Sequence, residues 1–257
     1  MNNENKSKLK PFLNKIIEGD CLEVMPKIPD KSIDMILADL PYGITRNKWD
    51  SIIPLDKLWS EYKRIIKDNG AIVLTATQRF ASQLVMSEPD LFKYDYVWVK
   101  SISSGQLNVN HQPLRSHEII LVFYKKQPTY NPQFTEGKPY SIVRKVTFKG
   151  ESYNKQKDTS KINNGYRYPT SVLYFSNPRV KGGHPTQKPV ELFKYLIKTY
   201  TNEGDVVLDN AIGSGTTAIA CLETGRNFIG IDISKKYYKM ARENIRKYKL
   251  QQKEKSI

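Results

Sequence analysis

Two short motifs in this chain combine residue types that can do chemistry. The first, Asp39-Leu40-Pro41-Tyr42, follows an apolar segment and places a carboxylate, a stiff proline turn and an aromatic ring next to one another. The second, Leu208 to Thr217, follows another apolar segment and contains Gly213 and Gly215, which permit tight backbone turning. The first motif predicts a site that binds a planar amine, and the second predicts a loop that binds a cofactor.

The chemistry that suits the first motif is methylation of an exocyclic amine on a nucleobase. Such a nitrogen is a poor nucleophile because its lone pair is delocalised into the ring, and hydrogen-bond acceptors around its N–H groups favour attack on a sulfonium methyl. Asp39 and the main-chain carbonyl of Leu40 supply two acceptors, Pro41 stiffens the turn, and Tyr42 offers a ring for stacking. An acidic turn with an incidental aromatic residue is the alternative interpretation.

The second motif is completed by acidic residues at two strand ends. Asp209 ends the strand before the glycines, and Asp232 ends the next strand, where a carboxylate can accept both hydrogen bonds of a ribose diol. The helix that begins at Thr216 directs its first amides toward a negative group. The chain lacks Gly-Lys-Ser/Thr and the third glycine of the dinucleotide fingerprint. The pattern therefore serves any adenosine cofactor, and a purely structural glycine turn stays open.

Alternating strand and helix signals predict an α/β fold that positions both motifs. Apolar runs typical of buried strands occupy 16–20, 32–39, 71–74, 92–100, 118–124, 205–209 and 227–232. Helical spacing occupies 55–66, 189–200, 216–223 and the segment after Ser234. We expect Asn69-Gly70 to end the first of these helices and 247–255 to be a polar tail that frays. A doubly wound, mostly parallel sheet covered by helices on both faces accommodates this order.

Composition restricts the partners of this chain. With 257 residues, one α/β domain with an insertion is expected. The 41 Lys and Arg exceed the 26 Asp and Glu, and the formal charge of +15 favours a polyanion such as nucleic acid. Cys21 and Cys221 make no disulfide framework, and His111, His117 and His184 have no metal-ligand spacing, so neither a metal nor a disulfide is expected. Without a long apolar run, signal peptide or lipidation motif, we expect a cytoplasmic protein that does not bind membranes.

The segment 125–181 interrupts the alternation of strands and helices. Between Lys138 and Lys188 there are eleven Lys and Arg against only Glu151 and Asp158, and aromatic residues are interleaved with them. Basic and aromatic side chains together suit phosphate contact and base stacking. A solvated loop that keeps the protein soluble is equally compatible with this composition.

Four blocks of sequence, taken in order, resemble the S-adenosylmethionine-dependent amino-group DNA methyltransferases of the permuted β class. The blocks are Ile17 to Cys21 leading to Asp39-Leu40-Pro41-Tyr42, Ser116 to Phe123, Gly183 to Pro189, and Leu208 to Thr217 with Gly230-Ile231-Asp232. The resemblance implies a circularly permuted class I methyltransferase fold, with one methyltransferase domain over 1–257. It also implies that the basic insert 125–181 is the target-recognition region.

The resemblance further implies roles for individual residues. The target base would be served by Asp39, Leu40, Pro41 and Tyr42. S-adenosylmethionine would be bound by Asp20, Cys21, Asp39, Thr186, Lys188, Asp209, Gly213, Gly215, Thr216 and Asp232. Within this set, Thr186 and Lys188 would close the methionine end, and Asp20 would lie near the adenine ring. His117 and Glu118 are interpreted as residues that order a strand.

Two positions depart from the pattern of the family. Leu40 replaces the usual proline, but the acceptor assigned to this position is a main-chain carbonyl, so activity is expected. Ala211 replaces an aromatic residue beside the cofactor, which predicts lower affinity or another side chain in that space. Because N4-cytosine members of the family usually begin this motif with serine, the resemblance implies that Asp39 acts on N6 of a flipped adenine in duplex DNA rather than on N4 of cytosine.

Several alternatives stay open at this stage. They are an N4-cytosine DNA methyltransferase, a methyltransferase that acts on structured RNA or protein glutamine, and a catalytically decayed DNA-binding relative. A homodimer is an expectation by analogy only. The residues do not reveal the recognition sequence, a partner nuclease, or a role in restriction and modification.

Overall fold

The computed structural model describes residues 3–43, 51–144, 159–178 and 187–255. They divide into two compact units: unit 1 is Met1–Asn131 with Ser171–Ile257, and unit 2 is Pro132–Thr170. Unit 2 is shorter than the predicted insert 125–181. At the C-terminal end the difference arises because Val172–Phe175 forms a strand that pairs with the main sheet of unit 1, and at the N-terminal end Asn131 is hydrogen-bonded to Thr199 of unit 1.

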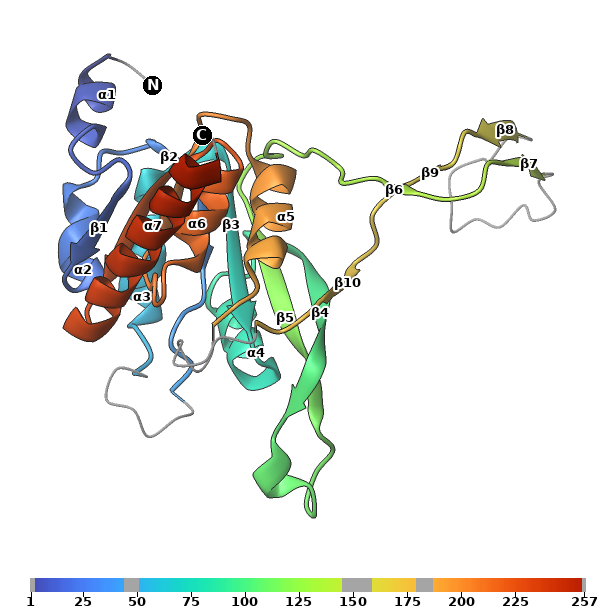
Figure 1. Cartoon of the computed structure of the whole chain (residues 1–257), viewed down its shortest axis with the longest axis horizontal. Coiled ribbons are helices and arrows are strands. Elements are labelled where there is room, and N and C mark those ends of the chain that lie inside the picture. The colour runs from blue at the N-terminus through green and yellow to red at the C-terminus, as the bar shows by residue number, and fades with distance from the viewer. Residues whose placement is uncertain (1–2, 44–50, 145–158, 179–186, 256–257) are drawn as a thin grey trace. The chain divides into compact units, whose positions relative to one another are not determined.

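The described part of unit 1 contains an eight-stranded sheet in the order β1-β12-β11-β2-β3-β5-β4-β10 (Figure 1). The strands are β1 (Lys15–Glu18), β2 (Ile33–Ala38), β3 (Ile66–Ala76), β4 (Phe92–Ser104), β5 (Arg115–Phe123), β10 (Val172–Phe175), β11 (Val206–Asp209) and β12 (Asn227–Asp232). Every neighbouring pair is parallel except the two made by β5, which runs antiparallel to β3 and β4. The predicted mostly parallel sheet is confirmed.

The centre of this sheet is a topological switch point. From β2 the chain continues to β3 on one side, whereas from β11 it continues to β12 on the other side. β2 and β11 are therefore parallel neighbours although they come from opposite ends of the chain. The strand that leads to Asp39 precedes the strand that ends at Asp209, which is the order expected for the permuted fold.

Helices cover both faces of the sheet, and each face has its own hydrophobic core (Figure 1). Alternate residues of β2 serve the two faces, since Ile36 belongs to one core and Leu37 to the other. The first face carries α1 (Asn3–Leu9), α2 (Cys21–Val24), the 3₁₀ turn η1 (Met25–Lys27), α3 (Leu55–Ile65) and α4 (Gln78–Ser87). The second face carries α5 (Val190–Tyr200), α6 (Thr216–Glu223) and α7 (Lys235–Lys255), drawn in orange to red. None of the described helices has the length and apolarity needed to cross a membrane.

Two local expectations are wrong. Helix α3 ends at Ile65 and β3 begins at the next residue, so Asn69-Gly70 lies inside a strand and does not end a helix. The register shifts along β3 because Ile33 pairs with Ile66 and Met35 with Ala71, which makes a bulge at this place. Gly70 suits the bulge, because a Cβ atom there would lie 2.8 Å from the main-chain oxygen of Asp34. The segment 247–255 is not a separate tail, because it continues α7 as far as Lys255.

Unit 2 is built from two small antiparallel ladders. β6 (Thr135–Glu136) pairs with β9 (Tyr166–Arg167), and β7 (Tyr140–Arg144) pairs with β8 (Thr159–Asn163). The guanidinium of Arg167 lies 4.5 Å from the ring centroid of Tyr140. Among the described residues of this unit no hydrophobic side chain is buried. Strand pairing, such polar contacts and the ring contacts of Phe134 with Tyr166 and Tyr168 connect the described segments of this unit.

Candidate active site

A cavity of about 670 Å³ lies at the carboxyl ends of β2 and β11. Parallel neighbours end at the same edge of a sheet, so the switch point brings Asp39 and Asp209 to one crevice, where α/β sheets bind ligands. Of the predicted site residues, the cavity is lined by Asp20, Cys21, Asp39, Leu40, Pro41, Tyr42, Lys188, Asp209, Gly213, Thr216 and Asp232. Gly215 supports the loop without lining the cavity. Thr186 lies outside the described residues.

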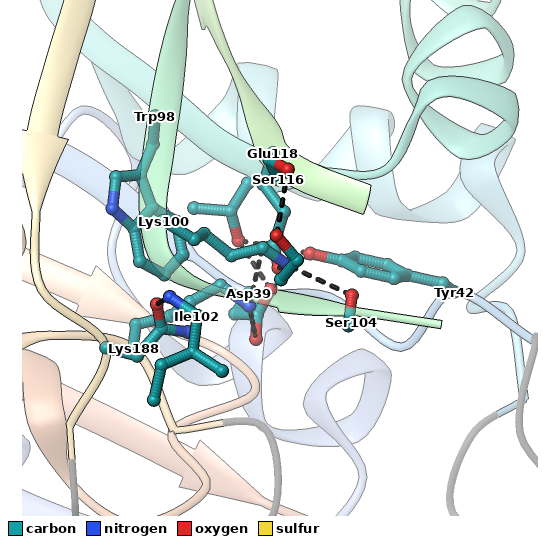
Figure 2. A network of polar contacts seen from close by, with 12 residues as sticks. Asp39, Tyr42, Trp98, Lys100, Ile102, Ser104, Ser116, Glu118 and Lys188 are labelled. Carbon is teal, nitrogen blue, oxygen red and sulfur yellow. Dashed lines mark hydrogen bonds and ion pairs between the residues drawn. The ribbon is translucent and has the colours of Figure 1, made fainter. Parts of the chain in front are cut away.

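The Asp39 carboxylate receives three hydrogen bonds (Figure 2). Its Oδ1 atom accepts from the hydroxyls of Tyr42 and Thr75, each at 2.5 Å, and its Oδ2 atom accepts from Nζ of Lys188 at 2.7 Å. The ring of Tyr42 packs on Phe80 at a centroid distance of 5.3 Å. Burial, and next the charge of Asp39, raise the pKa of Tyr42 well above its usual value, so its hydroxyl remains a donor. Asp39 is thus fixed in orientation as an acceptor at the cavity wall.

Lys188 connects Asp39 to a chain of buried charges of alternating sign. Its ammonium lies 3.2 Å from Oε2 of Glu118, and Oε1 of Glu118 lies 3.2 Å from Nζ of Lys100 (Figure 2). Burial alone would lower the pKa of Lys188, but Asp39 and its neighbours raise it well above its usual value. Burial alone would raise the pKa of Glu118, but the two ammonium groups lower it. Lys188 and Glu118 therefore keep their charges although both side chains are largely shielded from solvent.

Most of this arrangement is not predicted from the sequence. Glu118 is interpreted there as a residue that orders a strand, and neither Lys100 nor Thr75 is singled out. The resemblance to the family places Lys188 at the methionine end of the cofactor, whereas the structure brings its ammonium to Asp39. The available signal was a charged residue in each of two expected strands, Lys100 in 92–100 and Glu118 in 118–124, because charges inside a sheet are rarely left unpaired.

Two further carboxylates shape the part of the cavity at the carboxyl ends of β11 and β12. Asp232, at the end of β12, accepts from the main-chain amides of Gly213 at 2.9 Å and Ser234 at 2.8 Å. Burial raises the pKa of Asp232, and its two oxygens retain lone pairs beyond these two bonds. Asp209 accepts from the amide of Ala211 at 3.0 Å and from the hydroxyl of Thr217. Burial raises the pKa of Asp209 to about 7.

The glycine turn fits closely against α7. Gly215 has a φ of 90°, in the left-handed region, and a Cβ atom there would lie 3.2 Å from Cα of Ala241. Gly213 also has a positive φ, of 53°. A side chain at either position would strain the turn whose amides and carboxylates face the cavity.

Asn210 is a cavity residue that no sequence pattern assigned. Its Oδ1 atom accepts from the hydroxyl of Tyr62 at 2.5 Å. Its buried Nδ2 atom has no hydrogen-bond acceptor among the described residues, although the thiol of Cys21 interacts with the same side chain. An unmatched buried donor in a cavity that also offers two acid side chains fits a cofactor rich in nitrogen and oxygen acceptors and hydroxyls. Its place directly after Asp209 in the motif was the signal available.

The missing aromatic ring at Ala211 has counterparts elsewhere in the cavity wall. The aromatic side chains that line it include Trp98 from β4, Phe193 from α5 and Tyr237 from α7.

Burial raises the pKa of both Cys21 and Cys221, which suits inert thiols rather than nucleophiles. Among the described residues, no group of three or more His, Cys, Asp and Glu side chains could hold a metal ion.

The family model described as DNA methylase, of the N6/N4 methyltransferase type, matches residues 33–243, which include both motifs and most of the sheet. The chain belongs to this family of DNA methylases. It is 31% identical over 242 residues to the protein named DNA adenine methyltransferase YhdJ from Escherichia coli, an alignment that covers 88% of this chain and 80% of the relative. It is 26% identical to Type II methyltransferase M.HpaI from Haemophilus parainfluenzae, with 90% and 74% covered.

Solved structures agree with this assignment. The M1.HpyAVI complex with S-adenosylmethionine superposes with a TM-score of 0.61 at 25% identity, covering 90% of this chain and 98% of that one. The cytosine-N4-specific PvuII DNA methyltransferase superposes with a TM-score of 0.64 at 17% identity, covering 88% and 84%, which shows a shared fold. The fold of this DNA methylase is the class I methyltransferase fold.

Proposed function

We propose that this DNA methylase transfers a methyl group from S-adenosylmethionine to N6 of an adenine flipped out of duplex DNA at a specific sequence. The observation that carries the proposal is the Asp39 carboxylate, held as an acceptor by three donors at the wall of a cavity that also contains the cofactor loop. The name of the relative that shares 31% identity, DNA adenine methyltransferase YhdJ, favours adenine over cytosine.

In this proposal the residues of the chain orient the acceptor base. S-adenosylmethionine, when bound, supplies an electrophilic methyl group on a sulfonium. Asp39 accepts an N–H of the target amine through a lone pair that its present partners leave free, and the main-chain carbonyl of Leu40 accepts the other. Pro41 stiffens the turn between them, and the ring of Tyr42 stacks on the extruded base. The inert, buried thiols of Cys21 and Cys221 fit direct transfer without a covalent enzyme intermediate.

The cofactor is assigned to the carboxylates and the glycine turn at the ends of β11 and β12. Asp232 suits the ribose hydroxyls, and Asp209, Gly213, Gly215 and Thr216 maintain the turn. The further members of the cofactor set are Asp20, which caps α2, together with Cys21, Thr186 and Lys188. The ion pair between Lys188 and Asp39 gives Lys188 a second role, in positioning the catalytic carboxylate.

Modification mapping tests the proposal. Unmethylated duplex DNA is incubated with the protein and S-adenosylmethionine, and modified bases are located by single-molecule sequencing. We expect N6-methyladenine in one short motif, and a loss of at least about a hundredfold in Asp39→Ala, because a preorganised acceptor is removed. Asp95→Ala, an exposed position on β4, is the matched control and should methylate at the wild-type rate.

Other outcomes of the mapping would replace the proposal. Methylation at N4 of cytosine would support the assigned active site but would replace adenine by cytosine as the target base. Binding of cofactor and DNA without any modification would favour a decayed relative. Thermal unfolding of Asp39→Ala, followed by circular dichroism beside the wild-type protein, distinguishes a lost acceptor from a misfolded protein.

The proposal extends to the location and biological role of the protein. We place the protein in the cytoplasm on the cell's own DNA, in a restriction and modification role with a separately encoded nuclease, since several relatives are named Type II methyltransferases. A homodimer is the expected assembly, and sedimentation velocity of the purified protein checks it.

A further inference from the structure

The connection between β4 and β5 is a hairpin that leaves the sheet beside the active site (Figure 1). β4 runs parallel to β2, because both β3 and β4 are antiparallel to β5 and β3 is parallel to β2. The hairpin therefore emerges from the edge of the sheet at which Asp39 lies. Its first residues, Ile102, Ser103 and Ser104, line the same cavity as Asp39.

The tip of this hairpin presents apolar side chains to solvent. Leu107, on the 3₁₀ turn η2 (Gln106–Asn108), is 99% exposed, and Val109 and Leu114 are 52% and 43% exposed. The turn is hydrogen-bonded, with the amide of Asn108 donating to the carbonyl of Gly105 at 2.9 Å. Apolar side chains displayed together on a structured turn indicate an interaction surface.

The composition of the hairpin suits a polyanionic partner. From Ser101 to Ser116 the chain has no Asp or Glu, whereas it has Arg115 and a series of Asn, Gln and Ser side chains. Such a surface approaches phosphates without repulsion and offers hydrogen-bonding groups to sugars and base edges. Duplex DNA, the substrate class of this family, is the partner that fits both this surface and its position beside the cavity.

The base of the hairpin is connected to the catalytic carboxylate. Nζ of Lys100 donates to Oγ of Ser104 at 3.2 Å and to Oε1 of Glu118 at 3.2 Å (Figure 2). Glu118 in turn contacts Lys188, which holds Asp39. The hairpin thus has a defined position relative to the site that receives the base.

We propose that the β4–β5 hairpin enters the duplex and that Leu107 is an apolar wedge that fills the space left by the flipped base. This inference rests on the proposed function, because only a flipped base leaves such a gap. Extrusion of a base has an energetic cost, and an apolar side chain inserted between base steps offsets part of that cost. The wedge therefore acts on base extrusion and leaves cofactor binding unchanged.

The test compares Leu107→Ala with Met86→Ala, which truncates a 75% exposed side chain on α4. Both are assayed on a duplex carrying the sequence that the wild-type protein methylates, and on the same duplex with the target base mismatched. We expect Leu107→Ala to lower the methylation rate about tenfold on the paired duplex and less than about twofold on the mismatched one, where the base is already unpaired. Met86→Ala should match wild type on both duplexes.

Two results would overturn the wedge. They are a wild-type rate for Leu107→Ala on the paired duplex, and an equal loss on both duplexes. Failure of the proposed function is a different observation, since it would be seen in the wild-type protein as methylation of cytosine or of no base. Fluorescence of 2-aminopurine at the target position reports extrusion without methyl transfer, and Leu107→Ala should reduce that signal.

Discussion

Asp39, Lys188, Glu118 and Lys100 carry two negative and two positive charges in one connected group. A buried charge is costly unless a partner of opposite sign offsets its lost hydration. Their alternation explains why a catalytic acceptor can be kept beside an apolar core, and why its orientation depends on residues outside its own motif. Glu118 has a central place in this explanation, because it contacts both ammonium groups.

The variant Glu118→Gln tests whether Glu118 acts by positioning the carboxylate of Asp39 rather than by contacting the DNA. The amide keeps the shape but leaves the two ammonium groups with a single carboxylate, Asp39. We expect the free energy of unfolding to fall by roughly 2–4 kcal/mol, and kcat to fall while KM for DNA changes little. Urea denaturation and steady-state kinetics measure both. Glu191→Gln is the matched control, because Glu191 pairs with Lys194 at the surface and the change should cost less than about 1 kcal/mol. Equal effects of the two variants would contradict the buried network.

Asp209 should make stability depend on pH. The folded carboxyl has a pKa of about 7 because of burial, against 3.8 for an ordinary Asp. Between these values the folded protein binds a proton that the unfolded chain has released, so the free energy of unfolding falls as pH rises through this window. For this group the slope is at most about 1.4 kcal/mol per pH unit, and it vanishes above the folded pKa.

Asp209→Asn removes this titration and should give a flatter profile. Urea unfolding of both proteins from about pH 5 to about pH 8 measures the difference, and other groups cancel because they titrate in both. Parallel profiles for the two proteins would show that Asp209 does not bind a proton in this window.

At the scale of elements, the sequence predicts where the buried strands lie but does not predict which strands pair with one another. β2, β12 and α6 form where apolar runs and motif residues predicted them, because a strand covered on both faces has little choice of composition. Asn69-Gly70 gave a helix-stop signal, but pairing with β2 overrode it with a bulge. β10 was hidden in the basic insert, since only Leu173 of its four residues is buried.

The candidate site likewise has a part that the sequence predicts and a part that it does not. Asp39, Asp209 and Asp232 stand at strand ends that local patterns reveal. The link from Lys188 to Asp39 joins residues 149 positions apart. Only the order of strands in the sheet brings such groups together, and spacing along the chain does not encode that order.

The glycine turn before α6 gives an element-scale prediction. Gly215→Ala would force a left-handed φ on a residue with a side chain and press its Cβ against Ala241 in α7. Gly204→Ala is the matched control, because Gly204 has a φ of 84° and a Cβ atom added there would meet no other atom within 4 Å. We expect about 1 kcal/mol of destabilisation for the control and about 2–3 kcal/mol for Gly215→Ala. Only Gly215→Ala should weaken S-adenosylmethionine binding in calorimetry, and equal losses of affinity would assign the effect to strain alone.

At the scale of the whole molecule, we propose that stability and sequence choice belong to different parts of the chain. All described buried hydrophobic side chains lie in unit 1, which also contains the cavity. Unit 2 contributes eight Lys and Arg against three Asp and Glu, together with exposed Tyr166 and Tyr168. Its basic and aromatic surface suits phosphate contact and base stacking, which supports its proposed role in target recognition.

Replacing Pro132–Thr170 by a flexible Gly-Ser linker of about twelve residues tests this division. Both junctions remain anchored in unit 1, where the amide of Asn131 donates to the carbonyl of Thr199 and the amide of Val97 donates to the carbonyl of Ser171, each at 2.8 Å. We expect the free energy of unfolding to change by less than about 1 kcal/mol, because no hydrophobic side chain among the described residues of the replaced segment is buried. S-adenosylmethionine binding should persist, while DNA affinity falls and depends less steeply on salt concentration, since phosphate contacts are lost. Methylation that kept its sequence selectivity would place target recognition in unit 1, with the hairpin that carries Leu107 as the first region to examine, because it adjoins the cavity.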